Sequence, residues 1–137
     1  MKKVLIVSIF IVYNSLALAQ EEQKIDKKLN SCLDKSINEY ERQSCYSEAY
    51  TAWDDELNKY YNLYMSKLSD ENKQILKASQ RSWIRFRDKE FYLIDKHYLL
   101  ELKGTMWRAI AISQKTNLVQ ERAKKLKGYY QELRDFR

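Results

Sequence analysis

Helix-breaking residues are almost missing from this chain, and that absence restricts its fold more than any other feature. Proline does not occur among the 137 residues, and glycine occurs only at Gly104 and Gly128. Proline interrupts a helix and glycine weakens one, so a chain with so few of either is expected to form long helices. No segment shows the strict alternation of polar and apolar residues that is typical of a half-buried strand. The sequence therefore predicts an all-α fold.

Apolar side chains recur every three or four residues in three long segments, the spacing that places them on one face of a helix. These stripes cover residues 46–68, 76–100 and 107–133. Ser69 is a suitable N-cap for one helix, and Gly104 is a suitable stop. We therefore expect a small bundle built on a long antiparallel helical hairpin, with four helices at about residues 22–42, 45–68, 70–102 and 105–134.

Residues 1–19 have the three parts of a secretory signal peptide. Lys2 and Lys3 are followed by an almost unbroken apolar run and then by the small-x-small cleavage site Ala17-Leu18-Ala19. The apolar run is shorter than the roughly 20 residues that a membrane span needs, and no cysteine stands directly after it for lipid attachment. We therefore expect a single helical domain over residues 20–137, in the periplasm or secreted, with no membrane anchor after cleavage.

Cys32 and Cys45 are the two cysteines of the chain. An even number of cysteines in an exported protein predicts a disulfide. Closing a loop of roughly 14 residues would stabilise the fold by about 3 kcal/mol if the bridge acts through chain entropy. The alternatives are a reactive thiol pair and a metal site. Neither has support, because the spacing is not CxxC and His97 is the only histidine.

Charge and motif content narrow the function. The chain has 25 basic and 19 acidic residues, and its net charge of +6 falls to +4 when Lys2 and Lys3 leave with the signal peptide. The excess is mild and spread along the chain, whereas nucleic-acid binders more often carry a concentrated basic stripe. We find no HExxH, no GxSxG and no phosphate-binding loop. The sequence thus predicts no catalytic, metal or cofactor residues, no nucleic-acid partner, and a function in protein binding.

Two segments stand out by their composition. In residues 53–61, Leu57 and Tyr61 share an apolar helix face, and Asp54 and Asn58 lie beside it. In residues 80–88, Gln80, Trp83 and Arg87 share a face. A packed hairpin would place Leu57 and Trp83 in the core, pair Arg87 with Asp54 or another acid, and use the two amides internally. An exposed aromatic and arginine patch would instead form a protein-binding hot spot. The residues favour the packed hairpin.

The order of these residues resembles the lysozyme inhibitor LprI-like family. The resemblance rests on the pattern Cys32…Cys45…Asp54-x-Glu56-Leu57-Asn58-x-x-Tyr61, followed by Gln80-Arg81-x-Trp83-x-x-Phe86-Arg87-Asp88, and extends to about Leu126. It implies a helical, disulfide-stabilised envelope protein that inhibits lysozyme. It also implies a mostly structural role for the motif residues Asp54, Leu57, Asn58, Tyr61, Gln80, Trp83, Arg87 and Asp88.

The partner, on this resemblance, would be a protein and possibly lysozyme. Animal lysozymes are typically basic, and residues 54–56 are the densest acidic run after the signal peptide. Asp55 and Glu56 are therefore the candidate contact residues, because Asp54 is a candidate for an internal pair. Family members usually carry a further cysteine soon after the Arg-Asp pair, where this chain has Phe91. The alternative function is a non-catalytic interaction or scaffold protein of the cell envelope.

Overall fold

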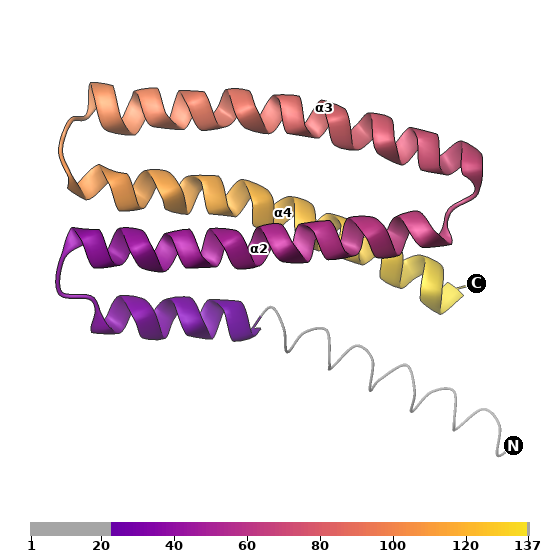
Figure 1. Cartoon of the computed structure of the whole chain (residues 1–137), viewed down its shortest axis with the longest axis horizontal. Coiled ribbons are helices and arrows are strands. Elements are labelled where there is room, and N and C mark those ends of the chain that lie inside the picture. Colours follow the sequence, from indigo (N-terminus) through magenta and orange to yellow (C-terminus); the bar gives the residue numbers. More distant parts are fainter. Residues whose placement is uncertain (1–22, 137) are drawn as a thin grey trace, which may run out of the picture.

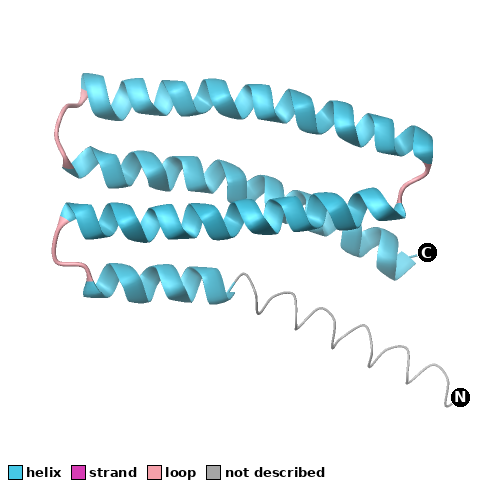
Figure 2. Ribbon diagram, in the orientation of Figure 1, coloured by secondary structure: helices cyan, strands magenta, loops and turns pink. Residues whose placement is uncertain are grey.

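Helices make up the part of the chain that the computed structural model describes, residues 23–136 (Figures 1 and 2). The first helix covers residues 23–35, and α2 (Glu39–Lys67), α3 (Asp70–Asp95) and α4 (Met106–Phe136) follow. A π-helical segment, η1 (Lys96–Glu101), continues α3. Because no strand occurs within residues 23–136, the all-α prediction is confirmed. The predicted signal peptide, residues 1–19, lies outside the described residues.

The break between the first two helices was predicted near residues 43–44 and lies instead at 36–38. Asn38 is the N-cap of α2, and its side-chain oxygen accepts a hydrogen bond from the backbone N–H of Glu41 at 2.9 Å. The Glu41 carboxylate in return accepts one from the backbone N–H of Ile37 at 2.8 Å. Such reciprocal bonds at a helix start form a capping box. The predicted cap at Ser69 is confirmed, since its hydroxyl accepts from the N–H of Asn72.

The core lies between α2 and α4, which pack closely and run in the same direction (Figure 1). Trp53, Leu57 and Tyr60 of α2 are buried there against aliphatic residues of α4, among them Val119 and Leu126. Two tyrosine pairs, Tyr60 with Tyr130 and Tyr64 with Tyr129, extend the contact, with ring centroids 6.2 and 5.7 Å apart. The densest packing therefore joins two helices that are separated in sequence by the whole of α3.

The first helix is fastened to α2 by the predicted disulfide. Cys32 and Cys45 are bonded, with their Cα atoms 5.7 Å apart, so this prediction is confirmed. Ile25 packs against the core, and Lys28 forms an ion pair with Glu48 of α2 at 3.1 Å. With so little of its surface buried, this helix depends on the bridge for its position.

Only Leu76 of α3 is buried. The sequence predicted one inward stripe along this helix, and that prediction is wrong for Phe86, Leu93 and Leu100, which are 50, 58 and 51 % exposed. The reason is geometric. On an α-helix Phe86 lies about 60° from Trp83, on a row that turns away from the bundle when Trp83 faces it. Apolar residues of α3 therefore occupy two rows, of which only one contacts the other helices.

Candidate functional site

The motif residues of α2 divide between the core and the surface. Leu57 is buried, as predicted, and Tyr61 is half-buried against the core cluster. Asp54 and Asn58 point away from that cluster. The Asn58 amide donates to the Asp54 carboxylate at 3.3 Å, an exposed contact within one helix. The prediction that Asn58 satisfies a buried group is therefore wrong, and this polar pair remains accessible on the outer side of α2.

The motif residues of α3 hold that helix against α4. The Arg122 guanidinium donates to the side-chain oxygen of Gln80 at 3.0 Å and to the Ser79 hydroxyl at 3.2 Å. It also lies over the ring of Trp83, 5.8 Å from the centroid. Trp83 is half-buried and packs on the core cluster, so its predicted burial is partial. Burial lowers the pKa of Arg122 from its usual value, although the group remains a cation.

Arg87 pairs with its neighbour and not with Asp54. Its guanidinium contacts the carboxylate of Asp88 at 2.7 Å and lies over the rings of Trp83 and Phe91, at 5.4 and 5.6 Å from their centroids. These contacts of Arg87 all lie within α3, and the same two rings meet cations of α4, Trp83 at Arg122 and Phe91 at Lys115. Each such contact contributes about 0.5–2 kcal/mol, depending on how far the cation is desolvated. The structure thus favours the packed-hairpin interpretation for Gln80, Trp83 and Arg87.

Tyr50 lies where the motif residues of α2 and α3 come together. Its ring is 6.1 Å from that of Phe91 between centroids. The pKa of its hydroxyl is raised above the usual value, first by burial and then by the negative charges of Asp54 and Asp88, while Arg87 opposes them. Both carboxylates therefore act on one tyrosine, although they belong to different helices. The approach of Asp88 to the same tyrosine as Asp54 was not evident from sequence spacing, and Asp88 is at the same time paired with Arg87.

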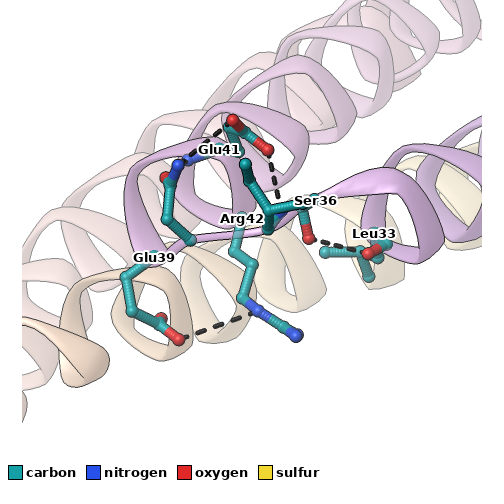
Figure 3. Close-up of polar contacts among 7 residues, drawn as sticks. Leu33, Ser36, Glu39, Glu41 and Arg42 are labelled. Carbon is teal, nitrogen blue, oxygen red and sulfur yellow. Dashed lines mark hydrogen bonds and ion pairs between the residues drawn. The ribbon is translucent and has the colours of Figure 1, made fainter.

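Two strongly exposed apolar side chains lie at the turn of residues 36–38 and directly after it. Ile37 is 87 % exposed, and Tyr40, at the start of α2, is 81 % exposed. The turn is nevertheless held firmly. The Ser36 hydroxyl donates to the carbonyl of Leu33 at 2.7 Å, and the Glu41 carboxylate closes the other side (Figure 3). We call residues 36–40 the braced turn, because the disulfide joins the two helices at its base.

The outer row of α2 connects the braced turn to the predicted contact acids. Its members, spaced by seven, four, four and three residues, are all exposed: Tyr40, Ser47, Thr51, Asp55 and Asn58. Residues at these intervals share one side of a helix. The Ser47 and Thr51 hydroxyls donate to carbonyls of their own helix, which leaves a low, smooth surface between the two ends. The row from Tyr40 to Asn58 is about 27 Å long at 1.5 Å per residue.

The two predicted contact acids differ in their surroundings. Asp55 is exposed in the outer row of α2. The side chain of Glu56 is only 15 % exposed, and its carboxylate forms an ion pair with Lys59 at 2.8 Å. Asp55 is therefore better placed to meet a partner. Residues 23–136 contain no group of three or more histidine, cysteine or acidic side chains arranged to hold a metal ion.

Comparison with known proteins was made for families, curated proteins and solved structures. Residues 32–126 match the model of the family described as lysozyme inhibitor LprI. The chain belongs to the LprI family. No curated protein and no solved structure gave a match. The matched segment begins at Cys32 and so includes the disulfide, the braced turn and both motif segments.

Two features of this LprI family member were not found from its sequence. Ile37 and Tyr40 were missed because residues 22–42 were predicted as one helix, which hides a turn. The available signal was Asn38 followed three residues later by Glu41, an N-terminal capping pattern. The second feature is the packing of Phe91, the residue that stands where a further cysteine was expected. Its ring packs between Tyr50, Arg87 and Lys115 and supplies a non-covalent contact at that point.

Proposed function

We propose that this protein is exported and binds lysozyme, slowing the enzyme without catalysing a reaction of its own. Membership of a family described as lysozyme inhibitors carries the proposal. The signal-like residues 1–19 support export, since they combine two lysines, an apolar run and a small-x-small site. No described helix has both the length and the apolar character to cross a membrane. Residues 20–137 would act as one unit.

The proposed contact surface is the outer row of α2 together with Ile37. A strong protein interface usually has a few large anchors, apolar or aromatic, within a more polar surround. Ile37 and Tyr40 supply such anchors, and the low surface at Ser47 and Thr51 allows a partner to approach closely. Because the braced turn is already fixed by hydrogen bonds and the disulfide, little conformational entropy is lost when it binds.

Electrostatics supports the same surface. The protein is basic overall, so its net charge does not attract a basic enzyme. Asp55 lies in the outer row and Asp54 directly precedes it, and their local negative charge can offset that disadvantage. Complementary charge at the rim of an interface mainly accelerates association. Asp55 and Glu56 are accordingly proposed as contacts that speed binding, with the larger part of the effect assigned to Asp55.

The test is a turbidity assay in which purified protein is added to lysozyme acting on cell walls. Animal, phage-type and bacterial lysozymes are each assayed. We expect the wild-type protein to slow at least one class. Replacing both anchors, Ile37→Ser with Tyr40→Ser, should weaken inhibition by about tenfold or more. The matched control, Ile75→Ser with Phe136→Ser, removes two exposed apolar side chains of α3 and α4 that are outside the outer row of α2 and the braced turn, and should inhibit normally.

A charge-reversal pair separates the acidic contribution. Asp55→Lys with Glu56→Lys should slow association and reduce its salt dependence. The control with the same change in net charge, Glu121→Lys with Glu132→Lys, alters two exposed acids of α4. If calorimetry detects no binding to any lysozyme class at low salt, the inhibitor proposal fails, and an envelope scaffold becomes the better function. Equal loss in both charge-reversal pairs would instead contradict the proposed surface.

A further inference from the structure

The outward side of α3 carries an apolar surface that the bundle does not cover. Eight of the thirteen exposed large apolar side chains within residues 23–136 lie between Ile75 and Leu102. Ile75, Phe86 and Leu93 are 60, 50 and 58 % exposed. They are spaced by eleven and seven residues, close to three and two helical turns, so they lie along one line. We call these three residues the apolar stripe, which is about 27 Å long.

A row of cations on α3 approaches the apolar stripe at the C-terminal end of the row. Four basic residues follow one another at intervals of four along α3, all of them exposed: Lys77, Arg81, Arg85 and Lys89. We call them the basic ridge. Like charges four residues apart destabilise a helix, so the ridge works against the stability of α3. Lys89 lies three residues after Phe86 and four before Leu93, which places it beside the stripe. Lys77 lies two residues after Ile75, about 160° around the helix from it, so the ridge meets the stripe only at Arg85 and Lys89.

Acidic side chains of the described residues do not neutralise the basic ridge. Arg85 makes a side-chain contact with the Ser82 hydroxyl at 3.4 Å, and no member of the ridge forms an ion pair within residues 23–136. The nearby Asp88 is engaged by Arg87, and Asp95 by Lys115 at 2.6 Å. The outward side of α3 therefore combines a straight apolar line with a cationic flank at Arg85 and Lys89, and Glu90, four residues after Phe86, lies on the opposite flank.

We propose that the outward side of α3 binds the surface of an anionic phospholipid bilayer. A helix with one apolar line and a cationic flank is suited to lie in the membrane interface, with the apolar residues among the headgroups and the cations on the phosphates. The helix would lie on the membrane and not cross it. This surface is separate from the outer row of α2, and its positive charge has the wrong sign for a basic lysozyme. The proposal is thus independent of inhibition.

Vesicle co-sedimentation at about 50 mM salt, where surface charges are screened less than at physiological ionic strength, tests the proposal. The exported protein is mixed with vesicles of phosphatidylcholine alone, or with about a third of phosphatidylglycerol. We expect binding to the anionic vesicles only. Arg85→Gln with Lys89→Gln should weaken it by about 30-fold, and Phe86→Ser with Leu93→Ser should also weaken it strongly. The matched control, Lys35→Gln with Lys125→Gln, should bind as the wild type does.

A site-specific probe checks the orientation. Both cysteines are in the disulfide, so a single introduced cysteine can carry an environment-sensitive dye. The dye at Phe86→Cys should report an apolar environment when anionic vesicles are added, and the dye at Asp55→Cys should not. Equal binding to neutral and anionic vesicles, or equal loss in the lysine control, would overturn the proposal. An absence of vesicle binding would also overturn the proposal, including the case where light scattering shows that the protein is a dimer.

Discussion

The α2–α4 pair and α3 are similar in length and composition, yet they are used differently. The pair buries aromatic and aliphatic side chains between its two helices. Trp53, Leu57 and Val119 are at most 3 % exposed. Helix α3 buries Leu76 alone and is held by cations over aromatic rings and by the bonds of Arg122. Stability is therefore concentrated in two helices, while the third keeps a large outward surface of its own.

The comparison teaches that apolar spacing does not by itself identify a core. Both α2 and α3 carry apolar residues at helical intervals. What separates them is the partner helix. The α2–α4 pair forms between helices that are separated in sequence by the whole of α3, which carries the chain from the end of α2 back to the start of α4 (Figure 1). Residues of α3 that do not meet this pair remain at the surface, whatever their hydrophobicity.

The largest expected effect on stability comes from removing a large side chain from the core. Trp53→Ala should lower the free energy of unfolding by about 3–5 kcal/mol, because a buried ring leaves a cavity. Trp53 is only 2 % exposed. Phe86→Ala, the matched aromatic change on α3, should alter that free energy by no more than about 0.5 kcal/mol. Urea denaturation followed by circular dichroism measures both. Similar losses in the two variants would break the comparison between the pair and α3.

Reduction of the disulfide should have the next largest effect. Opening the Cys32–Cys45 bridge should lower the free energy of unfolding by about 3 kcal/mol and lower the melting temperature. Most helicity should remain at room temperature, because the α2–α4 core does not include the bridge. Circular dichroism with and without reductant tests this, and a general loss of helix on reduction would show that the core depends on the bridge.

The contacts of Arg122 that hold α3 against α4 should contribute less to the free energy of unfolding. Arg122→Ala removes the bonds to Gln80 and Ser79 and the contact with Trp83, and should lower the free energy of unfolding by about 1–2 kcal/mol. Lys125→Ala, an exposed change three residues further along α4, should have almost no effect. A thermal-unfolding comparison of the two variants is sufficient. An unchanged midpoint in Arg122→Ala would mean that α3 is held by other contacts.

The smallest effect should have the opposite sign. Arg85→Glu replaces two like-charge neighbours at intervals of four with two opposite-charge neighbours, Arg81 and Lys89. Stability should therefore rise by about 0.5 kcal/mol. Binding to anionic vesicles should weaken in the same variant, measured by co-sedimentation. A variant that is both less stable and better bound would contradict the interpretation of the basic ridge.

Sequence spacing was sufficient to predict the helical class, the bridge and the burial of Leu57. It was insufficient wherever the answer depended on which helices meet. The row containing Phe86 and Leu93 follows the same periodicity as the row containing Leu76, and only the position of α4 distinguishes them. Arg87 was predicted to pair with Asp54 or another acid, and its partner is the adjacent Asp88. A charged side chain usually takes the nearest partner, and sequence alone does not rank the distances.

Local capping signals were also present in the sequence, but the helix boundaries were placed from apolar periodicity instead. Asn38 and Glu41 mark a helix start as clearly as Ser69 does, and they lie in a segment that was assigned to one long helix. Reading the cap first would have placed the turn at residues 36–38 and exposed Ile37 as a candidate contact. The approach of Asp54 and Asp88 to Tyr50 required the structure, because the two carboxylates come from separate helices.

Native-state hydrogen exchange tests the division between the α2–α4 pair and α3 most directly. Backbone amides open with free energies that range from near zero up to that of global unfolding. Amides in the middle of α2 and α4, around Trp53 and Val119, should exchange only through global unfolding. Amides of α3 around Phe86 should exchange through a local opening of lower free energy, in which α2 and α4 stay folded. Equal opening free energies in all three helices, with the same denaturant dependence, would contradict the account.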